Sequence, residues 1–255
     1  MNIFYIDESP AEIAKALVDK HVVKMPVESA QMLSTAKRLL DGKPFSVQHW
    51  RNGKPKEKIL YLLPGESYKI FKLPTKDGFD EWNDSVRYWN QKCYAVAHAH
   101  HPSTVWTMAN RTNYQWHCEL FVEMMKEYSR RYSRKHQCEQ LLHFLSRSPD
   151  NMPDGKFTPP TPAMPDKYKV DSVLESYRSF YAGEKWRFAK WKHGIMPAWF
   201  PHYMSTSWDA ESCADKASFI LEVQQKKTLP MDERVFNFGR KICYVQAEAL
   251  NSLAA

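Results

Sequence analysis

Glycine is scarce in this sequence, and its scarcity limits the folds open to the chain more than any other feature. Only 8 of the 255 residues are glycine. Folds with many tight β-turns need glycine where the backbone takes a positive φ angle, so an all-β fold is disfavoured. The glycine-rich fingerprints of dinucleotide-binding and P-loop proteins do not occur either. We therefore expect a mainly α-helical protein without a glycine-rich nucleotide loop.

Hydrophobic periodicity and capping residues predict where the helices lie. Ser9-Pro10-Ala11-Glu12 supplies an N-cap, a first-turn proline and a glutamate, and predicts a helix that ends near residue 20. The helical pattern continues over 21–40, where Pro26 must kink the helix or begin a new one. Further helices are predicted at 81–99, at 103–134 with an interruption near 110–113, and at 137–147, 171–181, 184–192, 208–227 and 231–252.

β structure is expected in two places only. Residues 2–6 form one short strand, and 59–63 with 67–73 are candidate strands of a small hairpin in a loop-rich stretch. The fold class is therefore mainly α. We expect a compact helical domain over residues 1–200, followed by a helical C-terminal extension over 201–255.

Six prolines between Ser148 and Lys169 exclude a helix or a central strand in that segment. Long irregular segments inside a compact domain are often functional. The prolines either wall a pocket and present the hydroxyl groups of Thr158 or Thr161, or form a rigid strap across helices. The strap is slightly favoured.

The charge balance favours a polyanionic partner. Lysine and arginine number 36 against 29 aspartates and glutamates, which gives a net charge of +7 and suits DNA, RNA or a phosphorylated substrate. The five cysteines include no C-x-x-C pair, so we expect reduced thiols. We also expect no metal and no cofactor. No signal-peptide pattern and no run of about 18 apolar residues occurs, so we expect a cytoplasmic protein without a membrane partner.

The first candidate site is a cluster of titratable residues in the predicted helix over 21–40 and just before it. Lys20 and Lys24 are four residues apart, as are Lys24 and Glu28, and such pairs share a helix face. A partly desolvated lysine can act as nucleophile or phosphate clamp, and His21 can carry protons near neutral pH. We expect the catalytic residues here, namely Asp19, Lys20, His21, Lys24 and Glu28. The alternative is a solvated helix face with ordinary ion pairs.

The second candidate site combines histidines with aromatic residues. His98 and His101 share a helical face, but no nearby cysteine or acidic pair completes a metal site, so we expect no metal there. Asn113 and His117 are four residues apart and can bind a base edge or an anion, and the tryptophans offer stacking faces. The candidate substrate-binding residues are His101, Trp106, Asn113, Trp116 and His117. The alternative is that these aromatic residues belong to the core.

The third candidate site is a basic stretch over residues 126–136. Lys126, Arg130 and Arg134 follow one another at a spacing of four, so on a helix they form a stripe that can track a phosphate backbone. A surface ridge without a partner explains the spacing equally well. Residues 185–192 interleave cations and aromatic residues in a smaller version of the same pattern.

Several motifs resemble a conserved protein family of tailed bacteriophages that has bacterial relatives. They are Asn-Ile-Phe-Tyr-Ile-Asp (2–7), Asp-Lys-His-Val-Val-Lys-Met (19–25), His-Pro-Ser-Thr-Val-Trp (101–106), Asn-Tyr-Gln-Trp (113–116), Ala-Met-Pro-Asp-Lys-Tyr-Lys (163–169) and Pro-Ala-Trp-Phe (197–200). The resemblance covers most of residues 1–200 and not the last ~55. It implies a role in DNA or nucleotide metabolism in the cytoplasm of an infected bacterium.

Three functions are consistent with these features. The first is an enzyme that acts on a DNA base, of a base-modifying or glycosylase-like type, in which the base leaves the duplex and stacks on Trp106 or Trp116. The second is a non-catalytic module that binds nucleic acid or a host protein. The third is an enzyme that acts on free nucleotides. DNA binding weakens steeply with salt, whereas the binding of a small nucleotide depends on salt less, so the salt dependence separates them.

Overall fold

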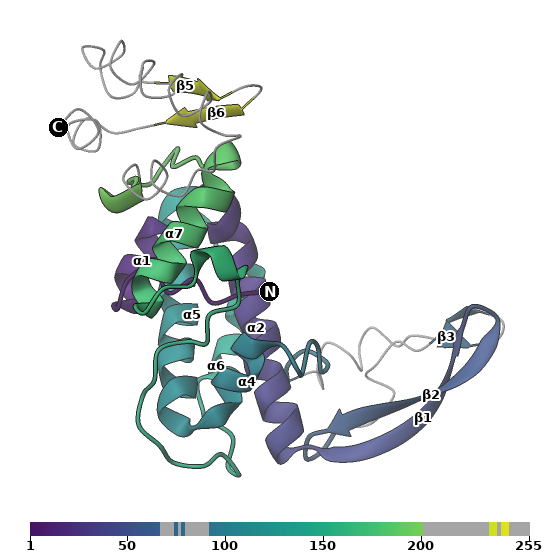
Figure 1. Ribbon diagram of the computed structural model, residues 1–255. Coiled ribbons are helices and arrows are strands. Elements are labelled where there is room, and N and C mark those ends of the chain that lie inside the picture. The colour runs from purple at the N-terminus through teal and green to yellow at the C-terminus, as the bar shows by residue number, and fades with distance from the viewer. Residues whose placement is uncertain (67–73, 76–77, 80–91, 201–234, 239–240, 245–255) are drawn as a thin grey trace. The chain divides into compact units, whose positions relative to one another are not determined.

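The computed structural model describes residues 1–66, 74–75, 78–79, 92–200, 235–238 and 241–244. Its α-helices are α1 (Pro10–Ala16), α2 (Asp19–Asp41), α4 (Pro102–Ala109), α5 (Arg111–Tyr132), α6 (Leu142–Leu145) and α7 (Val173–Lys185). Single 3-10 turns follow at η2 (Gln137–Leu141), η3 (Asp166–Tyr168) and η4 (Trp186–Phe188). The strands are β1 (Lys43–Arg51), β2 (Lys54–Leu62), β3 (Pro74–Thr75), β4 (Gly78–Phe79), β5 (Val235–Phe238) and β6 (Lys241–Tyr244). The protein is therefore predominantly α with β-hairpins, which confirms the predicted fold class (Figure 1).

The first helix follows the predicted capping signals. The Ser9 hydroxyl accepts a hydrogen bond from the Glu12 amide at 3.5 Å, and Pro10 occupies the first turn of α1. This helix ends at Ala16, a few residues before the predicted end, because the Val18 amide donates to the Tyr181 hydroxyl instead of continuing the helix. α2 then runs through Pro26 without a break.

The described residues fall into two units. Unit 1 contains Met1, residues 27–121 and residues 137–158, and unit 2 contains residues 2–26, 122–136 and the described residues from Pro159 onward. α2 and α5 each contribute residues to both units. Among the described residues, every helix is too short or too polar to cross a membrane.

A buried arginine fixes the irregular parts of unit 1. Arg38 on α2 has no exposed side-chain surface and donates to both carboxylate oxygens of Glu66, at 2.6 and 3.1 Å. It also donates to the backbone oxygens of Tyr61 at 2.7 Å, Cys93 at 3.0 Å and Tyr94 at 2.5 Å. One guanidinium group therefore holds the base of the β1–β2 hairpin and the segment after residue 91.

The predicted helix over 81–99 is wrong in its described part. Residues 92–99 are irregular, because α2 side chains occupy backbone groups that a helix would need. The Ser34 hydroxyl accepts from the Tyr94 amide at 3.1 Å, and the Thr35 hydroxyl bonds both the amide and the carbonyl of Ala97. The remainder of that prediction lies outside the described residues.

The hairpin in unit 1 differs from the predicted one. β1 and β2 pair antiparallel across the turn Asn52-Gly53, whose φ angles of 54° and 71° are those of a tight hairpin turn. The predicted strand over 59–63 coincides with the end of β2, whereas its predicted partner over 67–73 lies outside the described residues.

The predicted strand over residues 2–6 of unit 2 is wrong. The segment is buried but pairs with no strand among the described residues, because side chains of α7 and the proline-rich segment's backbone satisfy its polar groups. The Tyr177 hydroxyl lies 3.2 Å from the Asn2 side-chain oxygen, and Arg178 donates to the Ile6 carbonyl at 2.9 Å. The Asn2 amide in turn donates to the Ala163 carbonyl at 3.0 Å.

The proline-rich segment has the features of a strap. Apart from η3 it is irregular, and in unit 1 the Trp106 indole donates to the Thr158 carbonyl at 2.9 Å. In unit 2 the Thr161 carbonyl accepts from the Tyr177 hydroxyl at 2.9 Å. Backbone groups of the segment therefore bind helix side chains in both units.

Part of the predicted C-terminal extension also differs from the expectation. β5 and β6 pair antiparallel within the region predicted as a helix over 231–252. The helix predicted over 208–227 lies outside the described residues.

Candidate nucleic-acid interface

Asp19, the first residue of α2, brings three basic segments of unit 2 together. Its carboxylate accepts from the Arg131 guanidinium at 3.0 Å and from the Lys192 backbone amide at 2.9 Å. Its own backbone amide donates to the Lys190 carbonyl at 2.8 Å. The start of α2, the end of α5 and the chain after η4 therefore meet around one carboxylate.

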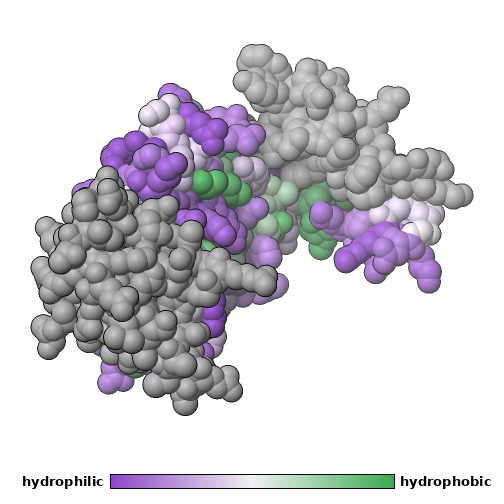
Figure 2. Space-filling model, turned by 90° about the horizontal axis from the view of Figure 1, so that it is seen from above, coloured by the Kyte–Doolittle hydropathy of each residue, from purple (hydrophilic) through white to green (hydrophobic). Residues whose placement is uncertain are grey.

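Most of the molecule's excess positive charge lies in these segments, which we call the basic surface and define as residues 19–24, 126–135 and 184–192. They hold eleven lysines and arginines and three acids, a net charge of +8, whereas the whole chain carries +7. The exposed cations are Lys20, Lys24, Lys126, Arg130, Arg134, Lys135, Arg187, Lys190 and Lys192. In the view of Figure 2, hydrophilic residues cover most of the described surface.

The acids of the basic surface are used mainly to hold its framework. Arg131 is fully buried and donates to Glu127 at 2.6 Å and to the carbonyls of Lys15 and Leu17 at 2.7 and 2.8 Å. Burial alone would raise the pKa of Glu127, but the hydrogen bonds from Arg130 and Arg131 lower it below its ordinary value. Internal ion pairs therefore fix the backbone from which the exposed lysines of the basic surface extend.

His21 does not have the properties expected of a proton carrier. Its ring stacks on Phe4 with centroids 4.7 Å apart, and its Nδ1 lies 2.8 Å from the Tyr181 hydroxyl. Burial, followed by the nearby charges of Lys185 and Lys24, lowers the pKa of His21 to about 3. The imidazole is therefore neutral at neutral pH, and it packs as an aromatic core residue.

The lysines predicted to be catalytic are not sheltered. Lys20 and Lys24 are exposed, and the Lys20 ammonium lies 5.1 Å from the centre of the Phe188 ring. Glu28 is buried, belongs to unit 1 and lies 3.6 Å from the amino group of Met1. The expected desolvation of the two lysines is thus wrong, and the Lys20 ammonium is exposed beside an aromatic ring.

In the second predicted site, three residues are engaged with the protein itself. Trp106 is only 4% exposed, and the Asn113 side chain bonds the Trp106 carbonyl and both the amide and the hydroxyl of Thr158. His117 is fully buried, with its ring nitrogens 2.8 Å from Thr107 and 3.0 Å from Ser29. Burial lowers the pKa of His117 to about 3. None of the three presents a free base-binding group, because their polar atoms hold unit 1 together.

The other two residues of that site are more accessible. His101 caps α4, where its Nδ1 accepts from the Ser103 amide at 3.2 Å, and burial, followed by the Met1 amino group and His98, lowers its pKa. Trp116 is half-buried, with its ring edge-on to Trp106 at 5.8 Å. The edge-on packing shows that Trp116 extends an aromatic cluster of unit 1.

The predicted basic stripe is shorter than expected. Lys126 and Arg130 share a face of α5 and pair with Glu123 and Glu127 at 2.7 and 2.6 Å. Arg134 lies beyond the helix, which ends at Tyr132 and is followed by Ser133 with a φ angle of 52°. Arg134 is therefore not on the stripe and instead lies 5.7 Å from the Tyr128 ring.

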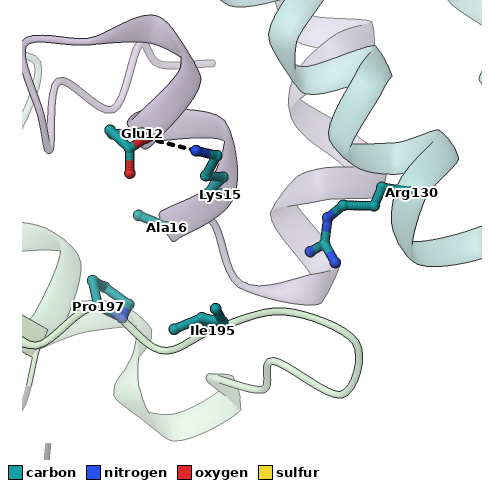
Figure 3. Close-up of a pocket in the computed structure, with 6 residues that line it drawn as sticks. All are labelled: Glu12, Lys15, Ala16, Arg130, Ile195 and Pro197. Atoms are coloured by element: carbon teal, nitrogen blue, oxygen red, sulfur yellow. Dashed lines mark hydrogen bonds and ion pairs between the residues drawn. The ribbon is translucent and has the colours of Figure 1, made fainter. Parts of the chain in front are cut away.

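A pocket of about 410 Å³ adjoins the basic surface within unit 2. Figure 3 shows Glu12 and Lys15 of α1 on one side, paired at 2.7 Å, and Arg130 of α5 on another. Ala16, Ile195 and Pro197 supply apolar lining. The pocket thus combines both signs of charge with an apolar wall.

Sequence reasoning did not place Glu12 and Lys15 near Arg130, since they lie more than a hundred residues apart in the chain. The sequence shows the interleaved cations at 185–192, but no sequence pattern connects them to Asp19. Within the described part of the chain, no cluster of histidine, cysteine, aspartate or glutamate is arranged to hold a metal ion. No protein-family model, curated protein or solved structure matches the chain.

Proposed function

We propose that the protein binds DNA through the basic surface, in the cytoplasm of a phage-infected bacterium. The observation that carries this proposal is that three basic segments meet at Asp19. Their combined net charge of +8 exceeds the net charge of +7 of the whole chain. Phosphate contacts by lysine and arginine dominate the affinity of proteins for nucleic acid.

The internal ion pairs support a binding role for the outer cations. Arg131 is neutralised by Glu127 and Asp19 inside the unit, so it stabilises the structure and adds no positive charge at the surface. Lys190 and Lys192 contribute only backbone groups to the contacts with Asp19, so both ammonium groups extend from a fixed backbone. Cations on a fixed backbone lose less freedom when they bind phosphates.

The test replaces two cations of the basic surface and compares them with two exposed cations of unit 1. We expect Lys190→Ala with Lys192→Ala to weaken binding to a duplex DNA oligonucleotide and to lower the slope of log K against log salt by about 2. Arg147→Ala with Lys156→Ala removes the same charge outside the basic surface and leaves the slope unchanged. Fluorescence anisotropy between 50 and 200 mM salt gives both slopes.

Two results would count against DNA binding by this surface. One is a wild-type protein whose affinity for DNA is insensitive to salt. The other is an equal loss in the two double variants, which would reflect net charge instead of a defined surface. Circular dichroism on each variant separates these outcomes from loss of folding.

The pocket beside Arg130 favours a second function, an enzyme that acts on a DNA base. Its volume of about 410 Å³ lies in the range of small-molecule sites, roughly 300–1,000 Å³, and its wall is partly apolar, as a flipped base requires. Its lining residue Arg130 also belongs to the basic surface. The Glu12 carboxylate and the Lys15 ammonium supply an acceptor and a donor.

Mass spectrometry of nucleosides tests this second function. Pure protein incubated with plain and with phage-modified DNA is expected to change the mass of one nucleoside or to release a base. Ile195→Trp, at an exposed pocket residue, is expected to reduce that change by narrowing the pocket, with the salt slope of binding unaltered. Unchanged nucleosides in both DNAs would leave DNA binding as the function of the surface and reject the enzyme.

A further inference from the structure

The β1–β2 hairpin of unit 1 carries its positive charge on one face. Residues directly opposite in an antiparallel pair share a face, and the register sets Arg51 opposite Lys54 and Lys56 opposite His49. With the two-residue period of strands, all five cations of the hairpin strands fall on that face: Lys43, Arg51, Lys54, Lys56 and Lys58. The one acid of the strands, Glu57, lies on the other face and is hydrogen-bonded to Ser46.

The cations of this face are open to solvent. All five cations are exposed, and none forms an ion pair with another residue that the structure describes. On the opposite face Ile59 is 55% exposed, whereas Leu60, the buried residue of the two strands, lies near the base on the cationic face. Toward the turn the two strands contain no buried residue, and His49 and Trp50 there are half-buried.

The charge pattern is unfavourable for the hairpin alone. An isolated two-stranded ribbon is marginally stable, and like charges directly opposite, as at Arg51 and Lys54, destabilise it further. The hairpin is held at its base, where Arg38 binds the Tyr61 carbonyl and Glu66. A firmly held ribbon with a repelling cationic face is suited to an anionic partner that relieves the repulsion.

We infer that the β1–β2 hairpin is an arm that binds duplex DNA through its cationic face, an inference that rests on the proposed function. Nine residues per strand span about 30 Å at about 3.4 Å per residue, close to the ~34 Å of one duplex turn. The major groove of B-form DNA admits a two-stranded ribbon. The regularly spaced cations of β2 then face phosphates along the groove.

The test compares charge removal with charge retention at two positions in β2. Lys56→Thr with Lys58→Thr keeps strand propensity and is expected to lower the salt slope for duplex DNA by about 2, with an affinity loss of about tenfold near 0.1 M salt. Lys56→Arg with Lys58→Arg is expected to retain the slope. Gln48→Ala on the opposite face, and Arg147→Ala with Lys156→Ala outside the hairpin, are the controls.

The outcomes separate this inference from the proposed function. If the unsubstituted protein binds DNA with a steep salt slope that the threonine variant keeps, the hairpin is not an arm and the basic surface still stands. If the unsubstituted protein shows no salt-dependent binding, both proposals fail. A threonine variant that loses binding to double-stranded RNA or to vesicles of anionic lipid, and keeps its binding to DNA, also overturns the inference.

Discussion

Two buried histidines make the stability of this molecule depend on pH. Burial lowers the pKa of both His21 and His117 to about 3, from an ordinary value of 6.5. Below pH 6.5 the unfolded chain takes up protons at these rings, while the folded protein does not. The stability that they confer is therefore present above pH 6.5 and is lost as the pH falls from 6.5 toward 3.

A substitution at His117 isolates this effect. His117→Gln keeps a hydrogen-bonding side chain between Thr107 and Ser29 but removes the titration. We expect the free energy of unfolding of the wild type to fall by about 2 kcal/mol more than that of the variant between pH 7 and pH 5. Urea unfolding at the two pH values measures the difference. Equal losses in the two proteins would mean that His117 is protonated in the folded state.

The burial of these histidines could not be predicted from the sequence. The spacing around His21 and His117 fits a helix in either case, and a helix face says nothing of which side chains from elsewhere cover it. For His21 the cover is Phe4 near the N-terminus together with Tyr181 and Phe188, which lie about 160 residues further along the chain.

Among the elements, the end of α5 depends on the packing of Gly194 against Arg131. A Cβ atom at Gly194 would lie 2.6 Å from the Arg131 Cζ atom, well inside contact distance. Arg131 cannot move aside easily, since its guanidinium is buried and bonded to Glu127, Asp19 and two carbonyl groups. The absence of a side chain at this position allows the segment after η4 to close over the arginine.

The substitution Gly194→Ala adds one methyl group at this contact and tests the packing. We expect Gly194→Ala to lower the free energy of unfolding by about 1–3 kcal/mol, the usual cost of overpacking a buried site. Ala198→Ser, at an exposed position of the same segment, is expected to change it by less than about 0.5 kcal/mol. Thermal and urea unfolding measure both. A fully stable alanine variant would show that Arg131 has another conformation of equal energy.

Elements with local signals were predictable, and elements defined by distant partners were not. The cap at Ser9 and the interruption of the long helical pattern at Asn110 are encoded by neighbouring residues, and both predictions are confirmed. The irregular backbone at 92–99 depends on side chains of α2 about 60 residues away. The hairpin turn at Asn52-Gly53 carried a local signal, but the loop-rich composition around it directed the prediction to later residues.

At the scale of the whole molecule, charge is strongly segregated. The basic surface carries +8 and the strands of the β1–β2 hairpin carry +4, so the rest of the chain carries −5. The net charge of +7 predicted a polyanionic partner, but the sequence alone did not define the basic surface or the cationic face of the hairpin. The basic surface needs Asp19 to bring its segments together, and the cationic face of the hairpin needs the strand register.

The packing around Arg131 also determines which positions of this protein can be substituted during evolution. Each exposed lysine of the basic surface can be exchanged singly, with a graded effect on affinity. Asp19, Arg131 and Gly194 depend on one another. Replacing Asp19 or Arg131 leaves an unpaired charge, and a side chain at Gly194 clashes with Arg131. Substitutions of the exposed lysines are therefore tolerated, whereas substitutions of Asp19, Arg131 or Gly194 are not. In diverged homologues we expect these three residues to be the last to change.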